Sequence, residues 1–193
     1  MKPGSIAIAV VIAVAVAGHP ARAQETTDSE SRQPWLSEIR VGVFAHDQAP
    51  LVDNIESGID LNVEALFRSP RSLRGIGAPR PHVGITLASE GTSLAYAGLT
   101  WEHDFRSHWF LDGSLGLAIH DGDPLQEHYQ TQREAATEKA MGCRIVAHLS
   151  VGAGYRISPH WNVAAHYEHL SNATLCGSND GLENIGIRVG RVF

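Results

Sequence analysis

Outside its amino-terminal segment, the sequence of 193 residues has no apolar run long enough to cross a membrane as a helix, which takes about 20 residues. It is also short of positive charge, with 15 Lys and Arg against 21 Asp and Glu. That deficit disfavours binding to nucleic-acid phosphates. The mean hydropathy of -0.12 is too low for a helical membrane protein. It does not exclude a membrane β-barrel, whose strands alternate apolar and polar residues.

The one long apolar run lies at the amino terminus. Lys2 precedes a stretch of Ala, Val and Ile over residues 6–17, and a small-x-small site follows at Ala21-Arg22-Ala23. This order is typical of a secretory signal peptide, so we expect residues 1–23 to be removed. The alternative is an uncleaved anchor helix. Residues 24–36 are polar and acidic, which predicts a flexible lead-in to the fold.

Cysteine is nearly absent, since Cys143 and Cys176 are the only two. Two cysteines are too few for a disulfide-stapled mini-protein, and further ligands at zinc spacing are missing. An exported chain enters a compartment that permits disulfides, so the two cysteines form either one bridge or two free thiols. Both cysteines are expected at the same end of the fold, so our hypothesis is a disulfide that tethers the loop after residue 172.

From Glu38 onward, apolar residues recur at every second position, which indicates strands with two chemically different faces. The pattern predicts eight strands: 37–46, 57–67, 81–89, 93–104, 109–120, 143–157, 161–172 and 182–193.

The predicted connections alternate between short turns and long polar loops, the longest being 121–142. An even number of strands, short turns at one end and long loops at the other are typical of outer-membrane barrels. We therefore predict an all-β fold, an eight-stranded antiparallel transmembrane β-barrel over residues 37–193. Residues 125–141 have a weak helical pattern. The connection 68–80 is unusually long, and its four arginines predict a solvated periplasmic turn, with a phosphate site as the alternative.

Six aromatic residues fall at strand ends beside the predicted short turns, where an interfacial girdle lies in outer-membrane barrels. The alternative is that they close the bottom of a soluble core. The last residue is aromatic as well, and this resembles proteins inserted by the bacterial outer-membrane assembly machinery. The six are Phe67, Phe105, Trp109, Tyr155, Trp161 and Phe193.

In the last two predicted strands the odd-numbered positions form the more apolar face, which we assign to lipid. Three polar residues break that face at its outer end: His169, Ser171 and Glu183. If Asn172 pairs with Leu182, Ser171 lies opposite Glu183 and His169 is diagonal to it, within side-chain reach. A serine esterase needs these three residue types as nucleophile, base and orienting acid. The alternative is a set of polar residues at a membrane interface.

The segments His169-Leu170-Ser171-Asn172-Ala173 and Asn179-Asp180-Gly181-Leu182-Glu183 resemble the signature of the lipid A 3-O-deacylase (PagL) family of outer-membrane acyloxyacyl hydrolases. The resemblance implies that His169 is the base, Ser171 the nucleophile and Glu183 the orienting acid. It also implies that Asn172 contributes to the oxyanion hole and that Asn179 lies in a supporting loop.

By this resemblance the substrate is lipid A of lipopolysaccharide, which loses its 3-O acyl chain in the outer leaflet. No cofactor and no metal are expected. Dimers occur in the family, so a homodimer is an alternative to a monomer by analogy.

Two rival functions stay open at this point. A non-enzymatic eight-stranded barrel would share the signal and the girdle without needing the polar triplet on the lipid face. A soluble lipocalin-like binder would have an apolar interior, whereas polar residues occupy the even-numbered face here. Two of them, His166 and Glu168, could suggest a metal site, but we expect a hydrogen-bond network in the lumen.

Overall fold

The computed structural model describes residues 35–48, 51, 53–122, 139–177 and 179–193. The expected signal peptide 1–23, nearly all of the expected lead-in 24–36 and most of the expected helix 125–141 lie outside these residues. No helix of the described part is long and apolar enough to cross a membrane.

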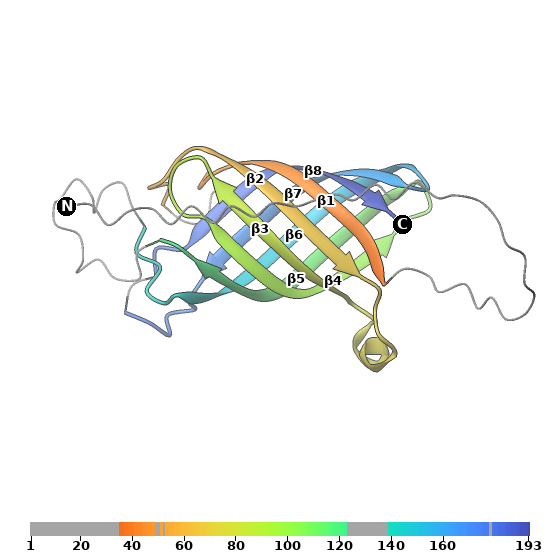
Figure 1. Cartoon of the computed structure of the whole chain (residues 1–193), viewed down its shortest axis with the longest axis horizontal. Helices are drawn as coiled ribbons and strands as arrows, with labels where there is room; N and C mark the ends of the chain where they lie inside the picture. Colours follow the sequence, from red (N-terminus) through yellow and green to blue (C-terminus); the bar gives the residue numbers. More distant parts are fainter. Residues whose placement is uncertain (1–34, 49–50, 52, 123–138, 178) are drawn as a thin grey trace, which may run out of the picture. The chain divides into compact units, whose positions relative to one another are not determined.

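The described residues form one closed antiparallel barrel in which each strand pairs with its neighbours in sequence and β8 pairs with β1 (Figure 1). The predicted eight-stranded barrel is confirmed, with every strand boundary within two residues of its predicted position. The only helix with described bounds is a six-residue 3-10 helix, η1 (Arg71–Ile76), between the second and third strands. The strands are β1 (Leu36–Ala45), β2 (Ile59–Phe67), β3 (Arg80–Ala88), β4 (Leu94–Asp104), β5 (Trp109–His120), β6 (Ile145–Ser158), β7 (Trp161–Ser171) and β8 (Leu182–Val192).

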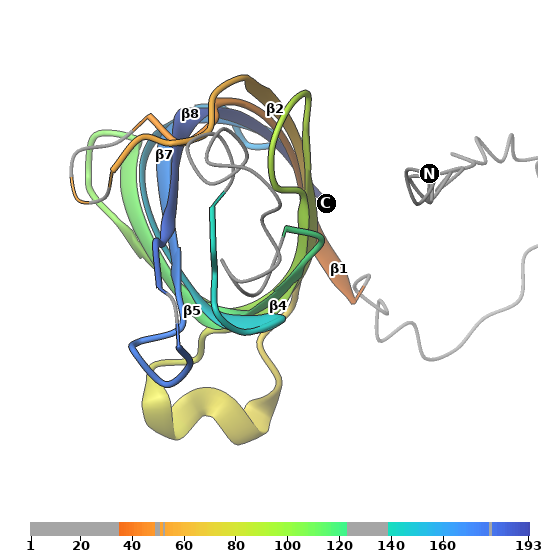
Figure 2. The same cartoon turned by 90° about the vertical axis from the view of Figure 1, so that its left-hand side faces the viewer.

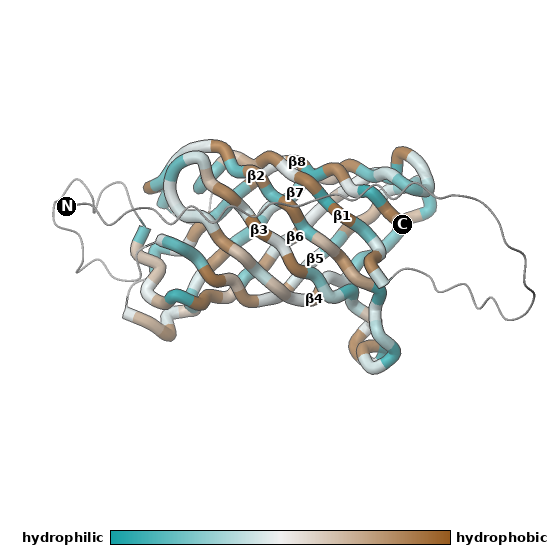
Figure 3. Tube along the Cα trace, viewed as in Figure 1, coloured by the Kyte–Doolittle hydropathy of each residue, from teal (hydrophilic) through white to brown (hydrophobic). Residues whose placement is uncertain are grey.

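Apolar and polar residues alternate along the strands, as the bands of Figure 3 show. This alternation gives the barrel an apolar outer surface and a polar interior. Outward residues such as Val41, Leu117 and Ile187 are more than half exposed in the isolated chain. Inward polar residues such as Asn162 and Arg188 are buried. This is the reverse of a soluble barrel that holds an apolar ligand, so the lipocalin-like alternative is wrong.

Charged side chains fill the lumen by pairing with one another. Arg40 donates to Glu38 at 2.9 Å, to Asp112 at 3.0 Å and to Glu102 at 3.2 Å. Nearer the outer end, Glu168 accepts hydrogen bonds from Asn184 and from a ring nitrogen of His148. The predicted lumen network around Glu168 is thus present. Within the described part of the chain, no group of three or more His, Cys, Asp or Glu side chains could hold a metal ion.

At the short-turn end, the predicted girdle residues Phe105, Trp109, Tyr155, Trp161 and Phe193 are between 39% and 53% exposed. Phe67 is half-buried because Trp35 stacks on it with ring centroids 4.9 Å apart. The expectation that all four arginines of residues 68–80 are solvated is wrong for Arg80. Its guanidinium pairs with Glu38 and Glu102 at 2.7 Å each, inside the barrel mouth.

A buried histidine closes the other end of the lumen. Both ring nitrogens of His46, which follows β1, lie against carboxylates: Nδ1 at 2.9 Å from Asp60 and Nε2 at 2.8 Å from Glu56. Burial opposes a charge on the ring, but the hydrogen bonds and charges of Asp60 and Glu56 outweigh it and raise the pKa of His46 to about 9. His46 is therefore a cation held between two acids at neutral pH.

A short segment, Lys139–Cys143, joins the loops above the barrel, and we refer to it as the strap. The fully buried ammonium of Lys139 lies 2.8 Å from Asp47 and donates to the carbonyl oxygens of Asp53 and Gly181 at 2.8 and 2.6 Å. Lys139 thus connects the β1–β2 loop to the β7–β8 loop. At its other end the strap carries Cys143, which is disulfide-bonded to Cys176 with the Cα atoms 5.8 Å apart.

We expect the stability of the barrel to fall at alkaline pH through His46. Its pKa is raised in the folded chain, so the stabilisation is complete below the unfolded value of about 6.5 and disappears as pH rises through about 9. Thermal unfolding in detergent micelles should therefore show a melting temperature that falls between pH 6.5 and pH 10. The variant His46→Gln should flatten this dependence, and an equal slope in both proteins would contradict the assignment.

We expect Lys139→Met to destabilise the outer end of the barrel, because it leaves the buried carboxylate of Asp47 without its ammonium partner. Breaking a buried ion pair in this way costs about 3–5 kcal/mol. The double variant Lys139→Met/Asp47→Asn should recover part of that loss, since the uncompensated charge is gone. The unfolding midpoints of the wild type, Lys139→Met, Asp47→Asn and the double variant form a double-mutant cycle, which measures the coupling between the two side chains. Strictly additive losses would mean that the two side chains are not coupled.

Candidate active site

His169 and Glu183 face each other across the β7–β8 pair, on the outer surface of the barrel. They are direct partners in the ladder, and His169 Nδ1 lies 3.0 Å from Glu183 Oε1. An ionised carboxylate only accepts, so the contact assigns the ring proton to Nδ1. Nε2 is then the nitrogen that can take up a proton.

The predicted register of this hairpin is wrong by two residues. The last paired residues are Leu170 and Leu182, so His169 and not Ser171 is opposite Glu183. The ladder stops there because Asn172 turns away: its backbone N–H donates to Asn179 Oδ1 at 2.8 Å, and Ala173 has a left-handed φ of 51°. The correction brings His169 and Glu183 closer together than the sequence pattern suggested.

The carboxylate of Glu183 is fully buried although its strand position faces outward. Three donors surround it: the His169 ring, the hydroxyl of Tyr167 at Oε1, and the backbone N–H of Leu51 at 2.9 Å from Oε2. Tyr167 is one outward position before His169 on β7 and could have been found from that spacing. Leu51 belongs to the β1–β2 loop, and no sequence pattern pointed to it.

Ser171 is the last residue of β7 and lies two positions beyond His169 on the same face, about 6.6 Å along the strand. It is half-buried, and the ladder places it opposite Ala147 of β6. Within the described residues its hydroxyl makes no hydrogen bond to His169. Catalytic hydrogen bonds are often long in enzymes without substrate, so this spacing is compatible with a nucleophile and its base.

The two asparagines expected beside the site are brought together. Besides the backbone bond between Asn172 and Asn179, the side-chain Nδ2 of Asn172 donates to the carbonyl oxygen of Met141 in the strap at 2.8 Å. The strap also exchanges two hydrogen bonds with Asp180 through Ala140. Together with the Cys143–Cys176 disulfide, these contacts fix the loop that follows Ser171.

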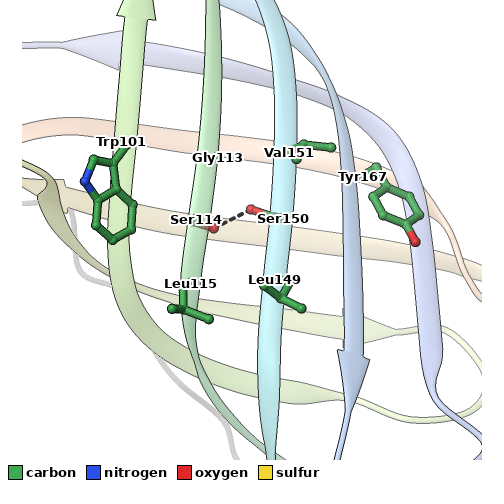
Figure 4. A pocket seen from close by; sticks show the side chains of 8 residues that line it. All are labelled: Trp101, Gly113, Ser114, Leu115, Leu149, Ser150, Val151 and Tyr167. Atoms are coloured by element: carbon green, nitrogen blue, oxygen red, sulfur yellow. Dashed lines mark hydrogen bonds between the residues drawn. The ribbon is translucent and has the colours of Figure 1, made fainter. Parts of the chain in front are cut away.

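A shallow groove of about 390 Å³ runs along the outer wall of the barrel, across strands β4 to β7. Tyr167 lies at one end and Trp101 at the other, with Val151 and Gly113 between them in one row of ladder partners across β7, β6, β5 and β4 (Figure 4). Leu149, which is paired with His169, also lines the groove. The groove is thus apolar and continuous with the His169–Glu183 pair.

Gly113 lines the groove without contributing a side chain to it. A Cβ built on Gly113 meets only the carbonyl oxygen of Ser150, at 3.8 Å, so ordinary packing does not require glycine there. At Gly98 and Gly116, by contrast, a Cβ would come within 2.4 Å of neighbouring backbone. Close packing therefore does not explain the glycine at position 113.

Solved structures similar to this chain include outer-membrane barrels and designed transmembrane barrels. A structure described as the crystal structure of the outer membrane enzyme PagL matches with a TM-score of 0.60 and 17% sequence identity, over 81% of this chain and all of that one. A de novo designed transmembrane β-barrel matches with a TM-score of 0.51 and 12% identity, over 84% and 98%. Neisserial surface protein A matches with 0.50 and 16%, over 83% and 98%. At such identities these likenesses show the fold alone.

Comparison of the sequence with curated proteins gives no match. A family model supplies the more specific finding: the one described as lipid A 3-O-deacylase (PagL) matches residues 79–191. That range is more than half of the chain, and it includes His169, Ser171 and Glu183. The rival interpretation as a non-enzymatic barrel is therefore wrong. This chain belongs to the lipid A 3-O-deacylase (PagL) family, and it is an outer-membrane β-barrel hydrolase.

Proposed function

We propose that this protein removes the 3-O acyl chain of lipid A by covalent catalysis, with Ser171 as nucleophile, His169 as base and Glu183 as orienting acid. The observation that carries the proposal is the pairing of His169 Nδ1 with a buried carboxylate on the lipid-facing surface. Charged groups beside hydrocarbon are energetically costly. The barrel fold gives no structural reason to place the His169–Glu183 pair at outward strand positions. His169 lies two residues from Ser171 on the same strand, so the pair can serve as base and orienting acid for that hydroxyl.

In the proposed reaction, His169 Nε2 takes the Ser171 proton as Oγ attacks the ester carbonyl carbon. The tetrahedral intermediate collapses when the bond to the sugar oxygen breaks, and His169 returns its proton to that oxygen. A water molecule, deprotonated by the same imidazole, then attacks the acyl-enzyme. The bond to Ser171 Oγ breaks, the imidazolium returns its proton to that oxygen, and the fatty acid is released. Glu183 holds the Nδ1–H and stabilises the imidazolium in both halves.

Asn172 is proposed to contribute to the oxyanion hole. Its place directly after the proposed nucleophile supports this role, and its hydrogen bonds to Asn179 and to Met141 of the strap fix its position. One donor to the oxyanion is worth about 2.7–4 kcal/mol in comparable hydrolases. The Cys143–Cys176 disulfide and Lys139 would then act as positioning groups, because they hold the same loop.

The substrate is proposed to approach sideways from the outer leaflet. The lumen is filled by paired charged side chains, so the outward face of β7 and β8 is the accessible side of the triad. The apolar groove from Tyr167 to Trp101 extends about 14 Å across three strand spacings, and we propose that it receives the acyl chain of the scissile ester.

Delivery to the membrane is proposed to use both ends of the chain. Residues 1–23 would direct export, and the terminal Phe193 would be recognised by the outer-membrane assembly machinery. A homodimer is not required for this chemistry, because one chain supplies all three proposed catalytic residues.

The decisive experiment expresses the chain in cells that make lipid A and weighs the lipid by mass spectrometry. Wild type should remove one ester-linked acyl chain, Ser171→Ala should remove none, and Glu183→Ala should be slowed but active, since orienting acids often matter less than nucleophiles. Ser107→Ala, in the exposed β4–β5 turn at the other end, is the matched control. Unchanged lipid A from a folded, membrane-inserted wild type would refute the proposal, as would full activity of Ser171→Ala.

The groove assignment predicts that Gly113→Leu makes the enzyme selective against long acyl chains. A Cβ at position 113 meets no steric conflict, and the rest of the leucine side chain would displace at least two methylene groups of the acyl chain, each worth about 0.8 kcal/mol. Long-chain ester cleavage should fall about tenfold relative to short-chain cleavage, measured as kcat/KM on purified protein in micelles. Ala95→Leu enlarges an exposed position of β4 outside the groove and should leave the ratio unchanged. An equal loss for both chain lengths in Gly113→Leu would exclude the groove as the acyl site.

A further inference from the structure

The β2–β3 connection is the one short-end link that carries a helix. Residues 68–80 contain four arginines and no acidic residue, in a chain whose formal charge is -6. Arg80 pairs with Glu38 and Glu102 at the barrel mouth. Arg71 and Arg74 lie on η1, are exposed, and form no ion pair within the described residues. Arg71 and Arg74 are therefore not part of the network of paired charges in the lumen.

The helix lies outside the barrel wall instead of below its rim. Figure 1 shows η1 end-on and Figure 2 shows it from the side, in both cases radially outside β4, so its axis runs across the barrel axis. The indole Nε1–H of Trp101 donates to the carbonyl oxygen of Ile76 at 2.8 Å. Trp101 is three residues before the end of β4, about 10 Å along the strand. This contact holds η1 against the outer surface of β4, near its short-turn end.

The backbone of η1 is capped at its carboxyl end. Gly77 and Ala78 have left-handed φ angles of 91° and 52°, and their N–H groups donate to the carbonyl oxygens of Arg74 and Leu73 at 3.3 and 3.0 Å. A non-glycine residue in this conformation is unusual and indicates a defined turn. The helix is thus a formed element, pinned to the lipid-facing surface before any ligand binds.

Its residue types match that location. Ile76 is 56% exposed in the isolated chain, and Leu73 is half-buried. A short helix that lies in the plane of a bilayer interface places apolar residues toward the acyl chains and basic residues toward the headgroups. Arginine stems extend along apolar surface while the guanidinium reaches the phosphates, which it can bind through two hydrogen bonds.

We propose that η1, with Arg71 and Arg74, is a binding site for anionic phospholipid headgroups in the periplasmic leaflet of the outer membrane. The site follows from the membrane location of the barrel and is independent of the deacylase chemistry. It anchors the short-turn end of the barrel at the opposite interface from the triad. A fully solvated turn would not need the Trp101 contact or the exposed Ile76.

Native mass spectrometry of the purified full chain, released from micelles with equal amounts of phosphatidylglycerol and phosphatidylcholine, tests this site. Wild type should retain phosphatidylglycerol preferentially. Each arginine near a charged lipid surface contributes about fivefold in affinity, so Arg71→Gln/Arg74→Gln should reduce the preference about thirtyfold. Arg106→Gln, in the exposed β4–β5 turn at the same end, should keep it. An unchanged preference in the double variant would overturn the proposal.

A label on the helix provides the second readout. The native cysteines are joined in a disulfide, so a nitroxide reacts only with the added thiol of Ser72→Cys or of the control Ser107→Cys. In vesicles containing phosphatidylglycerol, the label at residue 72 should be shielded from a water-soluble nickel reagent, and that at 107 should be accessible. Equal accessibility at both positions would overturn the interfacial placement. Circular dichroism of each variant verifies that the barrel is folded. Neither binding nor label accessibility depends on enzyme activity.

Discussion

Closure of the hydrogen-bonded ladder is the constraint on which the rest of the structure depends. In hydrocarbon an unpaired backbone N–H or C=O costs several kcal/mol, so a sheet that spans a membrane has to close on itself. Here the closing pair is β1 with β8, which brings Gly42 beside Arg188 and Val41 beside Val189. Once the ladder is closed, each residue has one of two environments, and the period of two along every strand decides which.

The inward environment is small, and polar residues fill it. Arg40 pairs with Glu38 on the same strand and with Asp112 of the distant strand β5, and Arg188 donates to the hydroxyl of Tyr96. Because these groups occupy the interior, no substrate path through the barrel is needed or available among them. The proposed chemistry on a lipid therefore uses the outward face, where polar groups are rare and energetically costly.

Period-two alternation predicted the barrel and its strand boundaries because it reports the two environments directly. The same reasoning identified His169, Ser171 and Glu183 as exceptions on the lipid face. It failed at the β7–β8 register, since where the ladder ends depends on Asn172 bonding to Asn179 and Met141 instead of to β8. It also missed Leu51 and Lys139, because contacts between loops carry no period. Arg80 was misplaced for a similar reason: its partners, Glu38 and Glu102, come from other strands.

The environment of Glu183 explains how a carboxylate can remain at an outward position. Water is scarce beside hydrocarbon, so the charge needs donors from the protein, and Tyr167, His169 and the Leu51 N–H supply them. Two of these donors come from neighbouring strand positions, whereas the third requires the β1–β2 loop to fold over the site. That loop is in turn tied to Lys139, whose ammonium also binds the carbonyl oxygen of Gly181, two residues before Glu183. The outer loops are thus part of the site, because they replace the water that a soluble esterase would use to stabilise the same acid.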